Sequence, residues 1–164
     1  MKYLLIIVLL CLFAHSSYTV AEVNFNKVGE ARMKYLFWDI YDASLFTPTG
    51  VYQPGDHPIK FTLTYLRDFS AKDIVKATNE QWQHLGKQQL TARYADRLLA
   101  LWPNINKGES LTLQTDQQGQ SVFFHNGEKL GHIEDADFAD QFLAIWLSEH
   151  TSEPKLRKQL LGEL

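Results

Sequence analysis

The amino-acid sequence predicts an α+β fold, a mostly antiparallel sheet with helices grouped on it, built as one domain. The order of the segments indicates this: strands come first, then two helices, then three short strands, then two more helices. A doubly wound parallel fold would alternate strands and helices, and no glycine-rich phosphate loop is present. The chain has 164 residues, of which 45% are apolar and 21% charged, so it is long and apolar enough to bury one core.

Residues 1–21 are expected to be a secretory signal peptide that is cleaved, which leaves 22–164 as the folded domain. A lysine at position 2 precedes an unbroken apolar stretch, 4–13, which suits the core of a signal and is too short to span a bilayer. Small residues fit a cut after Ala21. The only cysteine, Cys11, would be lost with the signal. We therefore expect a periplasmic or secreted protein with no stable membrane insertion after cleavage.

The first part of the expected domain contains strands separated by a loop. Residues 25–46 are expected to be strand, because they are rich in aromatic side chains and partly alternate. Residues 47–58 contain three prolines and two glycines, which indicate a loop. Residues 59–65 alternate strictly between apolar and polar side chains, which predicts a strand with one buried face.

Two helices are expected next. The first covers 70–86: Ser70 and Asp73 form a good helix start, apolar side chains recur at helical spacing, and Gly86 favours an end. The second covers about 91–101 and ends before a proline, because the residue preceding proline disfavours the helical conformation.

The rest of the domain is expected to be a strand meander and two closing helices. Short runs at 111–115, 120–125 and 129–133 are joined by Gln118-Gly119 and Asn126-Gly127, and Asn-Gly is a strong hairpin signal.

Asp135 is expected to cap a helix that runs to Leu147, with Phe138, Phe142, Ile145 and Trp146 as its inward stripe. A last helix follows, with a proline at its first position and a glycine after its end.

Charge and side-chain inventory exclude several function classes. A net charge of −3 argues against non-specific nucleic-acid binding, which needs a positive surface. The histidines after residue 21 show no i, i+4 pair on a helix and have no cysteine beside them, so no metal or other cofactor is expected. A G-x-S-x-G nucleophile elbow is absent. The carboxylates within 134–140 fit a helix start, and a glycosidase-like pair among them stays open.

Two arginines are the strongest candidates for a binding site. Arg32 lies in the most aromatic strand region, and Arg67 lies between a strand and a helix start, where ligand pockets often open. A guanidinium in an apolar cleft can hold a carboxylate through two hydrogen bonds, and a neighbouring tyrosine hydroxyl can complete the site. The alternative is that each arginine lies over aromatic surface with its charge in water, or pairs with Asp39 or Asp68.

The order of several short motifs resembles the chalcone isomerase-like superfamily, especially its bacterial exported branch. The motifs are VGEAR at 28–32, YDASLF at 41–46, YLRDFSAK at 65–72, NGEKLG at 126–131 and LLG at 160–162. Together they cover nearly all of the expected domain. The resemblance implies an open-faced β-sandwich, a large antiparallel sheet with helices packed on one face and a ligand cleft between them.

The resemblance also implies which residues serve the cleft. The family contains isomerases, fatty-acid-binding proteins and catalytically silent relatives, and all of them use an arginine on an early strand, which is Arg32 here. Tyr41 stands where the isomerases have a threonine, as in the fatty-acid-binding members, so Arg32 and Tyr41 are expected to clamp a carboxylate. Tyr65 and Asn79 are carried over as pocket candidates, and no catalytic residue is assigned.

The favoured function is an exported, non-enzymatic binding protein for a small amphipathic ligand such as a fatty acid. Besides Arg32, Tyr41, Tyr65 and Asn79, the residues Arg67 and Trp82 are expected to bind this ligand. The tail is expected to lie on Ile74, Thr78, Trp82, Phe61 and Leu63. The alternative is an intramolecular lyase of the chalcone isomerase type acting on an unsaturated ketone. A third option is an envelope protein whose surface binds a partner, and the oligomeric state is not predicted.

Overall fold

The computed structural model describes residues 23–164, and the signal peptide expected at 1–21 lies outside them. The described residues form one six-stranded antiparallel sheet and four helices, which confirms the predicted α+β class. The strands are β1 (Asn26–Tyr35), β2 (Trp38–Thr47), β3 (Lys60–Tyr65), β4 (Ser110–Thr115), β5 (Ser121–His125) and β6 (Glu128–Ile133). The helices are α1 (Ala71–His84), α2 (Gln89–Leu101), α3 (Phe138–Leu147) and α4 (Pro154–Leu160). No helix in this part of the chain is long and apolar enough to cross a membrane.

The strands follow one another across the sheet in chain order, from β1 to β6, and each is antiparallel to its neighbours. The alternation expected in β3 is confirmed, because Phe61, Leu63 and Tyr65 are buried on the inner face. On the outer face the hydroxyls of Thr62 and Thr112 lie 2.9 Å apart and hydrogen-bond across β3 and β4. The sheet therefore has one apolar face and one largely polar face.

The single strand segment expected over 25–46 is instead a hairpin with a turn at Leu36 and Phe37. Leu36 has a φ of 53°, a left-handed conformation that glycine and asparagine favour. The predicted Asn-Gly turn between β5 and β6 has the same feature at Asn126, with a φ of 50°. Sequence patterns miss the first turn because neither Leu nor Phe is a usual turn residue.

The predicted start of α1 is confirmed. The backbone N–H of Asp73 donates to Ser70 Oγ at 3.1 Å, and the backbone N–H of Ser70 donates to the Asp73 carboxylate at 3.3 Å. This reciprocal pair is a capping box, and it satisfies two amides that would otherwise be unpaired at the helix start. Gly86, with a φ of 71°, follows the end of the helix as expected.

The start of α3 differs from the expectation. Asp135 does not cap the helix, which begins three residues later at Phe138. Its carboxylate instead accepts hydrogen bonds from the Tyr94 hydroxyl at 2.5 Å and from the backbone N–H of Asp137 at 3.1 Å. Arg93 also pairs with this carboxylate. Asp135 therefore fastens α2 to the start of α3, and these contacts hold the pKa of Asp135 below its usual value, the Tyr94 hydrogen bond first.

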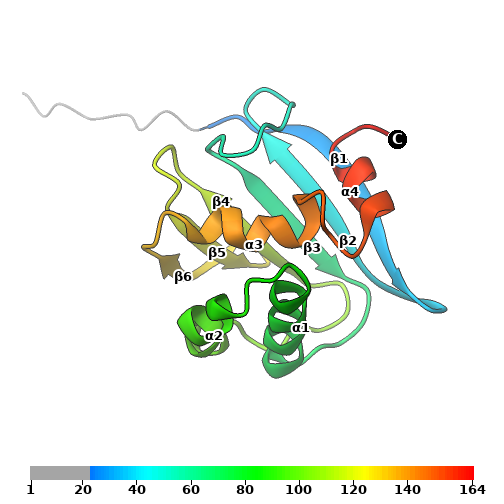
Figure 1. Ribbon diagram of the computed structural model, residues 1–164, viewed down its shortest axis with the longest axis vertical. Helices are drawn as coiled ribbons and strands as arrows, with labels where there is room; N and C mark the ends of the chain where they lie inside the picture. The colour runs from blue at the N-terminus through cyan, green and yellow to red at the C-terminus, as the bar shows by residue number, and fades with distance from the viewer. Residues whose placement is uncertain (1–22) are drawn as a thin grey trace, which may run out of the picture.

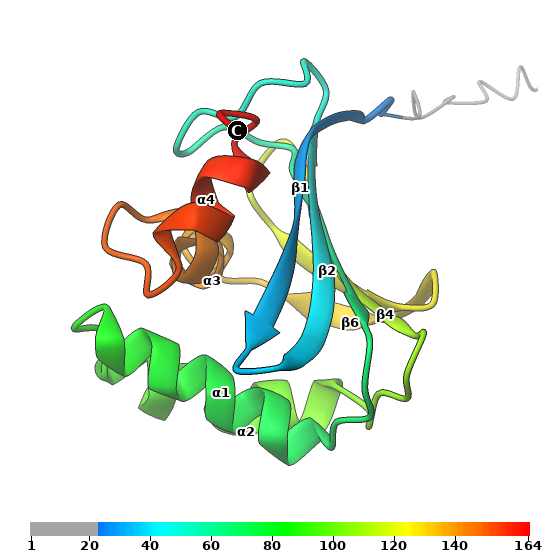
Figure 2. The ribbon, with the colours of Figure 1, turned by 90° about the vertical axis from the view of Figure 1, so that its right-hand side faces the viewer.

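All four helices lie in front of the sheet in Figure 1, and Figure 2 shows them gathered on one side of it. An aromatic cluster fills the space between the two layers. The ring of Phe142 on α3 lies 5.8, 5.6 and 5.1 Å from the rings of Phe123, Phe138 and Trp146, measured between centroids. The inward stripe expected for this helix is thereby confirmed, since all of its members are buried.

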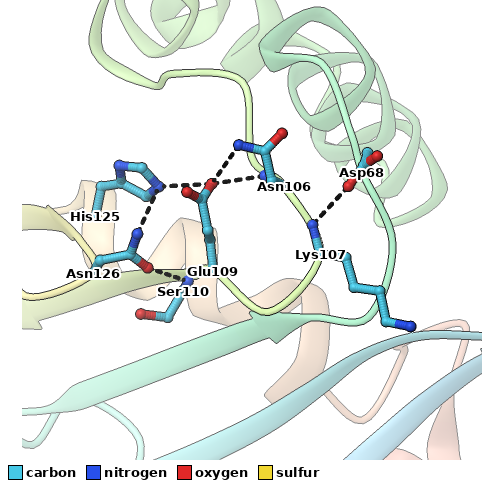
Figure 3. A network of polar contacts seen from close by, with 7 residues as sticks. All are labelled: Asp68, Asn106, Lys107, Glu109, Ser110, His125 and Asn126. Carbon is cyan, nitrogen blue, oxygen red and sulfur yellow. Dashed lines mark hydrogen bonds and ion pairs between the residues drawn. The ribbon is translucent and has the colours of Figure 1, made fainter.

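The loop between β3 and α1 is fastened to the loop before β4 by the polar network in Figure 3. The backbone N–H of Lys107 donates to the Asp68 carboxylate at 2.7 Å. Glu109 accepts the backbone N–H of Asn106 at 2.7 Å and lies 3.1 Å from the ring nitrogen of His125. These two contacts, the Asn106 amide first, hold the pKa of the Glu109 carboxyl below its usual value. The network is internally paired and has a structural role.

Candidate functional site

A cavity of about 330 Å³ lies between the inner face of the sheet and helices α1 and α3. Its walls are mainly apolar and aromatic. The sheet contributes Met33, Tyr35, Ile40, Tyr41, Leu63, Tyr65 and Leu111. The helices and the segments beside them contribute Phe69, Ile74, Ala77, Thr78, Trp102, Phe142, Ile145 and Trp146. Such a volume is at the lower end of the range for small-molecule pockets, about 300–1,000 Å³.

The strand register explains which side chains reach this cavity. Met33, Tyr41 and Tyr65 are neighbours across β1, β2 and β3. Since side chains alternate along a strand, this row lies on the inner face, and the adjacent pair Arg32 and Asp42 lies on the outer face.

Tyr41 is held by a residue from the far end of the chain. The indole N–H of Trp146 donates to the Tyr41 hydroxyl oxygen at 2.8 Å, so the hydroxyl hydrogen of Tyr41 stays available to donate. Burial, together with the nearby Glu153 carboxylate, raises the pKa of Tyr41 to about 12, although the Trp146 hydrogen bond opposes the shift. At neutral pH this hydroxyl is therefore protonated and acts as a donor.

Tyr65 places a second hydroxyl in the cavity wall. Its ring lies edge-on to Tyr41, with the centroids 5.9 Å apart. Burial raises the pKa of Tyr65 well above its ordinary value, and Tyr41 adds a smaller upward contribution. Within residues 23–164 no side chain or backbone group hydrogen-bonds to this hydroxyl. An oxygen atom of a bound molecule would give it a partner.

The charged residues that line the cavity are acidic. They are Asp73 and Glu153, and no lysine, arginine or histidine of the described chain lines it. The side chain and backbone of Ser70 hold the pKa of Asp73 below its usual value, so this carboxylate is ionised at neutral pH. The cavity therefore suits an apolar molecule with an uncharged, hydrogen-bond-accepting group better than an anion. No group of metal-ligating side chains is present among residues 23–164.

A family comparison agrees with this architecture. The family model described as chalcone isomerase-like matches residues 15–162. The chain belongs to the chalcone isomerase-like family. Membership confirms what the order of the sequence motifs predicted, and the antiparallel sheet with helices on one face matches the fold that the resemblance implied.

Two relatives of this chalcone isomerase-like protein extend the comparison. It is 25% identical over 142 residues to an uncharacterized protein of Haemophilus influenzae, an alignment that covers 85% of the chain and 69% of that protein. It is also similar to the crystal structure of a fatty-acid binding protein from Arabidopsis thaliana, with a TM-score of 0.66 and 12% identity. That similarity covers 84% of this chain and 86% of the plant protein, and at this identity it shows the fold alone.

The predicted clamp of Arg32 and Tyr41 is wrong, because the two side chains lie on opposite faces of the sheet. Arg32 is exposed and forms a bidentate ion pair with Asp42, in which its Nε and Nη2 atoms lie 2.7 and 2.9 Å from the two carboxylate oxygens. Its Nη1 atom also lies 3.2 Å from an Asp39 carboxylate oxygen. The alternative considered for this arginine, a surface ion pair that includes Asp39, is the correct one. Tyr41 and Tyr65, by contrast, both line the cavity, and their contact with a ligand stays a prediction.

Arg67 also lies outside the cavity. The carbon of its guanidinium lies 4.0 Å from the centre of the Trp38 ring, and the residue is exposed. This cation–π contact is the alternative in which the arginine covers aromatic surface with its charge in water.

Asn79 and Trp82 are on α1 but do not reach the cavity. Trp82 is fully buried, and its indole N–H donates to the backbone carbonyl of Gln141 at 3.1 Å. Asn79 lines a different hollow, about 540 Å³, on the surface between α1 and α2. Of the tail contacts expected, Ile74, Thr78 and Leu63 line the cavity, whereas Phe61 is in the core.

Several wall residues were not predicted as site residues. Trp146 and Phe142 were predicted only as part of the buried stripe of their helix. Whether they also line a cavity depends on how α3 crosses the sheet, which the sequence pattern does not show. The position of Met33 and Tyr35 could have been predicted. They alternate with the charged residues Arg32 and Lys34, and side chains along a strand point alternately to its two faces, so the odd positions of β1 form the inner face.

Proposed function

We propose that this protein binds an acyl lipid, such as a fatty acid or a fatty-acyl derivative, in the cavity between the sheet, α1 and α3, without catalysing a reaction. The observation that carries the proposal is an apolar cavity whose wall contains two protonated tyrosine hydroxyls. The fold shared with a plant fatty-acid binding protein supports it. Each methylene of the acyl chain buried here would contribute about 0.8 kcal/mol.

The polar end of the lipid is proposed to lie at Tyr41 and Tyr65. Both hydroxyls can donate to a carbonyl or hydroxyl oxygen, and the contact from Trp146 orients the first of them. Because Asp73 and Glu153 line the same cavity, an ionised carboxylate would be repelled there. We therefore propose that the lipid is bound with an uncharged head: a protonated acid, an ester or an alcohol.

Extraction of lipid from the purified protein, followed by mass spectrometry, tests the proposed function. The expected result is about one acyl lipid per protein molecule, displaced by added fatty alcohol. A protein that carries no lipid and takes up none from solution would overturn the proposal. Conversion of a chalcone to a flavanone above the uncatalysed rate would overturn its non-enzymatic part.

Replacing Tyr65 by phenylalanine tests the head contact. Tyr65→Phe is expected to weaken binding of a fatty alcohol about fivefold to tenfold, since one hydrogen bond contributes roughly 1 kcal/mol. The melting temperature should hardly change, because this hydroxyl has no partner among the described residues. Arg32→Ala is the matched control, and its affinity should equal that of the wild type because Arg32 lies on the outer face. Equal binding by Tyr65→Phe would place the head elsewhere.

Tyr41→Phe is expected to behave differently. The change leaves the buried indole N–H of Trp146 without its acceptor, so the free energy of unfolding should fall by about 1–2 kcal/mol. Chemical denaturation of Tyr41→Phe and Tyr65→Phe side by side measures this difference. Equal stability of the two variants would show that the Trp146 contact contributes nothing.

The charge of the head has a pH signature. If only the protonated acid enters the cavity, the apparent affinity for a fatty acid should rise as the pH falls from 8 to 6, by up to about tenfold per pH unit, because the protonated fraction rises in that proportion. The affinity for a fatty alcohol of equal chain length should stay constant over this range. Displacement of an uncharged fluorescent probe measures both. An affinity for the fatty acid that stays constant between pH 8 and pH 6 would show that the ionised acid binds, because the carboxyl group is almost fully ionised over this range, and would contradict an uncharged head.

We also propose that the protein is exported and that residues 1–21 are removed, on the basis of the charged start, the apolar stretch and the small residues before position 22. Mass spectrometry of the intact protein isolated from the cell envelope tests this. A mass that includes residues 1–21 in the accumulated protein would contradict cleavage.

A further inference from the structure

The turn of the β1–β2 hairpin exposes four consecutive large side chains: Tyr35, Leu36, Phe37 and Trp38, here called the tip. Their exposed fractions are 64%, 76%, 97% and 55%. Figure 1 shows this hairpin, coloured blue to cyan, extending beyond the rest of the molecule. A contiguous apolar patch of this kind on a soluble domain commonly marks an interaction site.

The tip is not explained by the needs of the turn. Leu36 adopts a left-handed conformation, which is unfavourable for a branched apolar residue. In the β5–β6 turn the residue with this conformation is Asn126. The β5–β6 turn shows that an Asn-Gly pair is sufficient to reverse the chain between two strands of this sheet. The apolar character of the tip therefore serves something other than the hairpin.

The tip is continuous with the cavity. Tyr35 belongs to both, and Met33 and Ile40, on the two strands behind the tip, also line the cavity. An acyl chain that entered or left at this end would pass along the tip. A bilayer in contact with the tip would thus lie next to this end of the cavity.

The cations around the tip are largely neutralised within the protein. Lys34 lies 3.3 Å from the Asp39 carboxylate, and Arg32 pairs with Asp42. Arg67 is the exception: it lies over the Trp38 ring, and none of the ion pairs among residues 23–164 includes it. The attraction to a membrane would therefore be mainly hydrophobic, with little dependence on acidic lipids.

We propose that the tip docks the protein reversibly on the surface of a lipid bilayer. Leu36 and Phe37 would enter the acyl region, and Tyr35 and Trp38 would lie at the depth of the headgroups, where amphipathic rings are favoured. The exposed surface of these four side chains is smaller than the about 800 Å² per partner that a stable protein interface buries, which favours a bilayer over a second protein. The docking is independent of the cavity, whereas transfer of lipid from the bilayer rests on the proposed function.

Vesicle flotation tests the docking. The protein, in the form in which cells accumulate it, is mixed with phosphatidylcholine vesicles, with or without phosphatidylglycerol. The test variant is Leu36→Asn with Phe37→Gly, which copies the Asn-Gly turn of β5–β6 and keeps the hairpin. The control is Val51→Ser, which removes an exposed apolar side chain from a different loop. Unchanged melting temperatures establish that both variants are folded.

The bound fraction is expected to fall at least tenfold in the tip variant, to stay unchanged in the control, and to depend little on phosphatidylglycerol. Equal flotation of wild type and tip variant, or no flotation of the wild type, would overturn the proposal. A dimer in sedimentation analysis that disappears in the tip variant would also overturn it, in favour of a second copy. Wild-type flotation by a variant with a blocked cavity would show that docking holds even if lipid binding fails.

Discussion

Ala77→Trp is expected to weaken lipid binding strongly while the fold persists. Ala77 is exposed on α1 and lines the cavity, so an indole at this position would occupy the space of the acyl chain without disturbing the core. Exclusion of about four methylenes would weaken binding by about two-hundredfold, at about 0.8 kcal/mol each. Titration with a fluorescent fatty alcohol measures the affinity, and the melting temperature reports the fold.

Lys76→Trp is the matched control for this variant. Lys76 is the preceding residue, and it lines the surface hollow between α1 and α2 instead. The same indole there should leave the affinity unchanged. If Lys76→Trp blocked binding and Ala77→Trp did not, the lipid would lie in that hollow and not between the sheet and the helices.

Gly29→Ala is expected to cause the largest loss of stability. A Cβ at Gly29 would collide with the backbone carbonyl oxygen of Gln159 and would lie 2.5 Å from that of Leu160, so α4 could not keep its place against β1. Because the obstacle is backbone, we expect a loss of about 3 kcal/mol and a melting temperature lower by about 6–12 °C.

Gly131→Ala provides the comparison. Its Cβ would meet only the end of the Leu101 side chain, at 2.7 Å, and that side chain can rotate away. The loss should be about 1 kcal/mol or less. Thermal denaturation of both variants tests the contrast, and equal losses would show that α4 is not held tightly against β1.

Local signals in the sequence were sufficient for most of the fold. The alternation in β3, the capping pair Ser70 and Asp73, and the Asn-Gly turn are each produced by neighbouring residues, so they can be read without knowledge of the rest of the chain. The turn at Leu36 and Phe37 carried no such signal, because neither leucine nor phenylalanine is a usual turn residue.

The site was harder to predict because it depends on which face of the sheet each strand residue points to and on contacts between residues far apart in the chain. The aromatic surroundings of Arg32 and the family resemblance both pointed to the cleft, yet its neighbours Ala31 and Met33 face inward, which places Arg32 outside with Asp42. The polar pair of the site joins Tyr41 to Trp146, and no local pattern relates two residues so far apart. Tyr65, which ends the alternating strand on its apolar face, was the site residue best supported by the pattern.

A crystal structure of the protein with a fatty alcohol that carries bromine at its terminal carbon would locate both ends of the bound lipid. The anomalous signal of bromine locates the tail independently of the fit of the chain. We expect bromine between the sheet and α1, with the alcohol oxygen within hydrogen-bonding distance of the Tyr65 hydroxyl. Bromine in the hollow between α1 and α2, or an oxygen placed against Arg32 on the outer face, would contradict it.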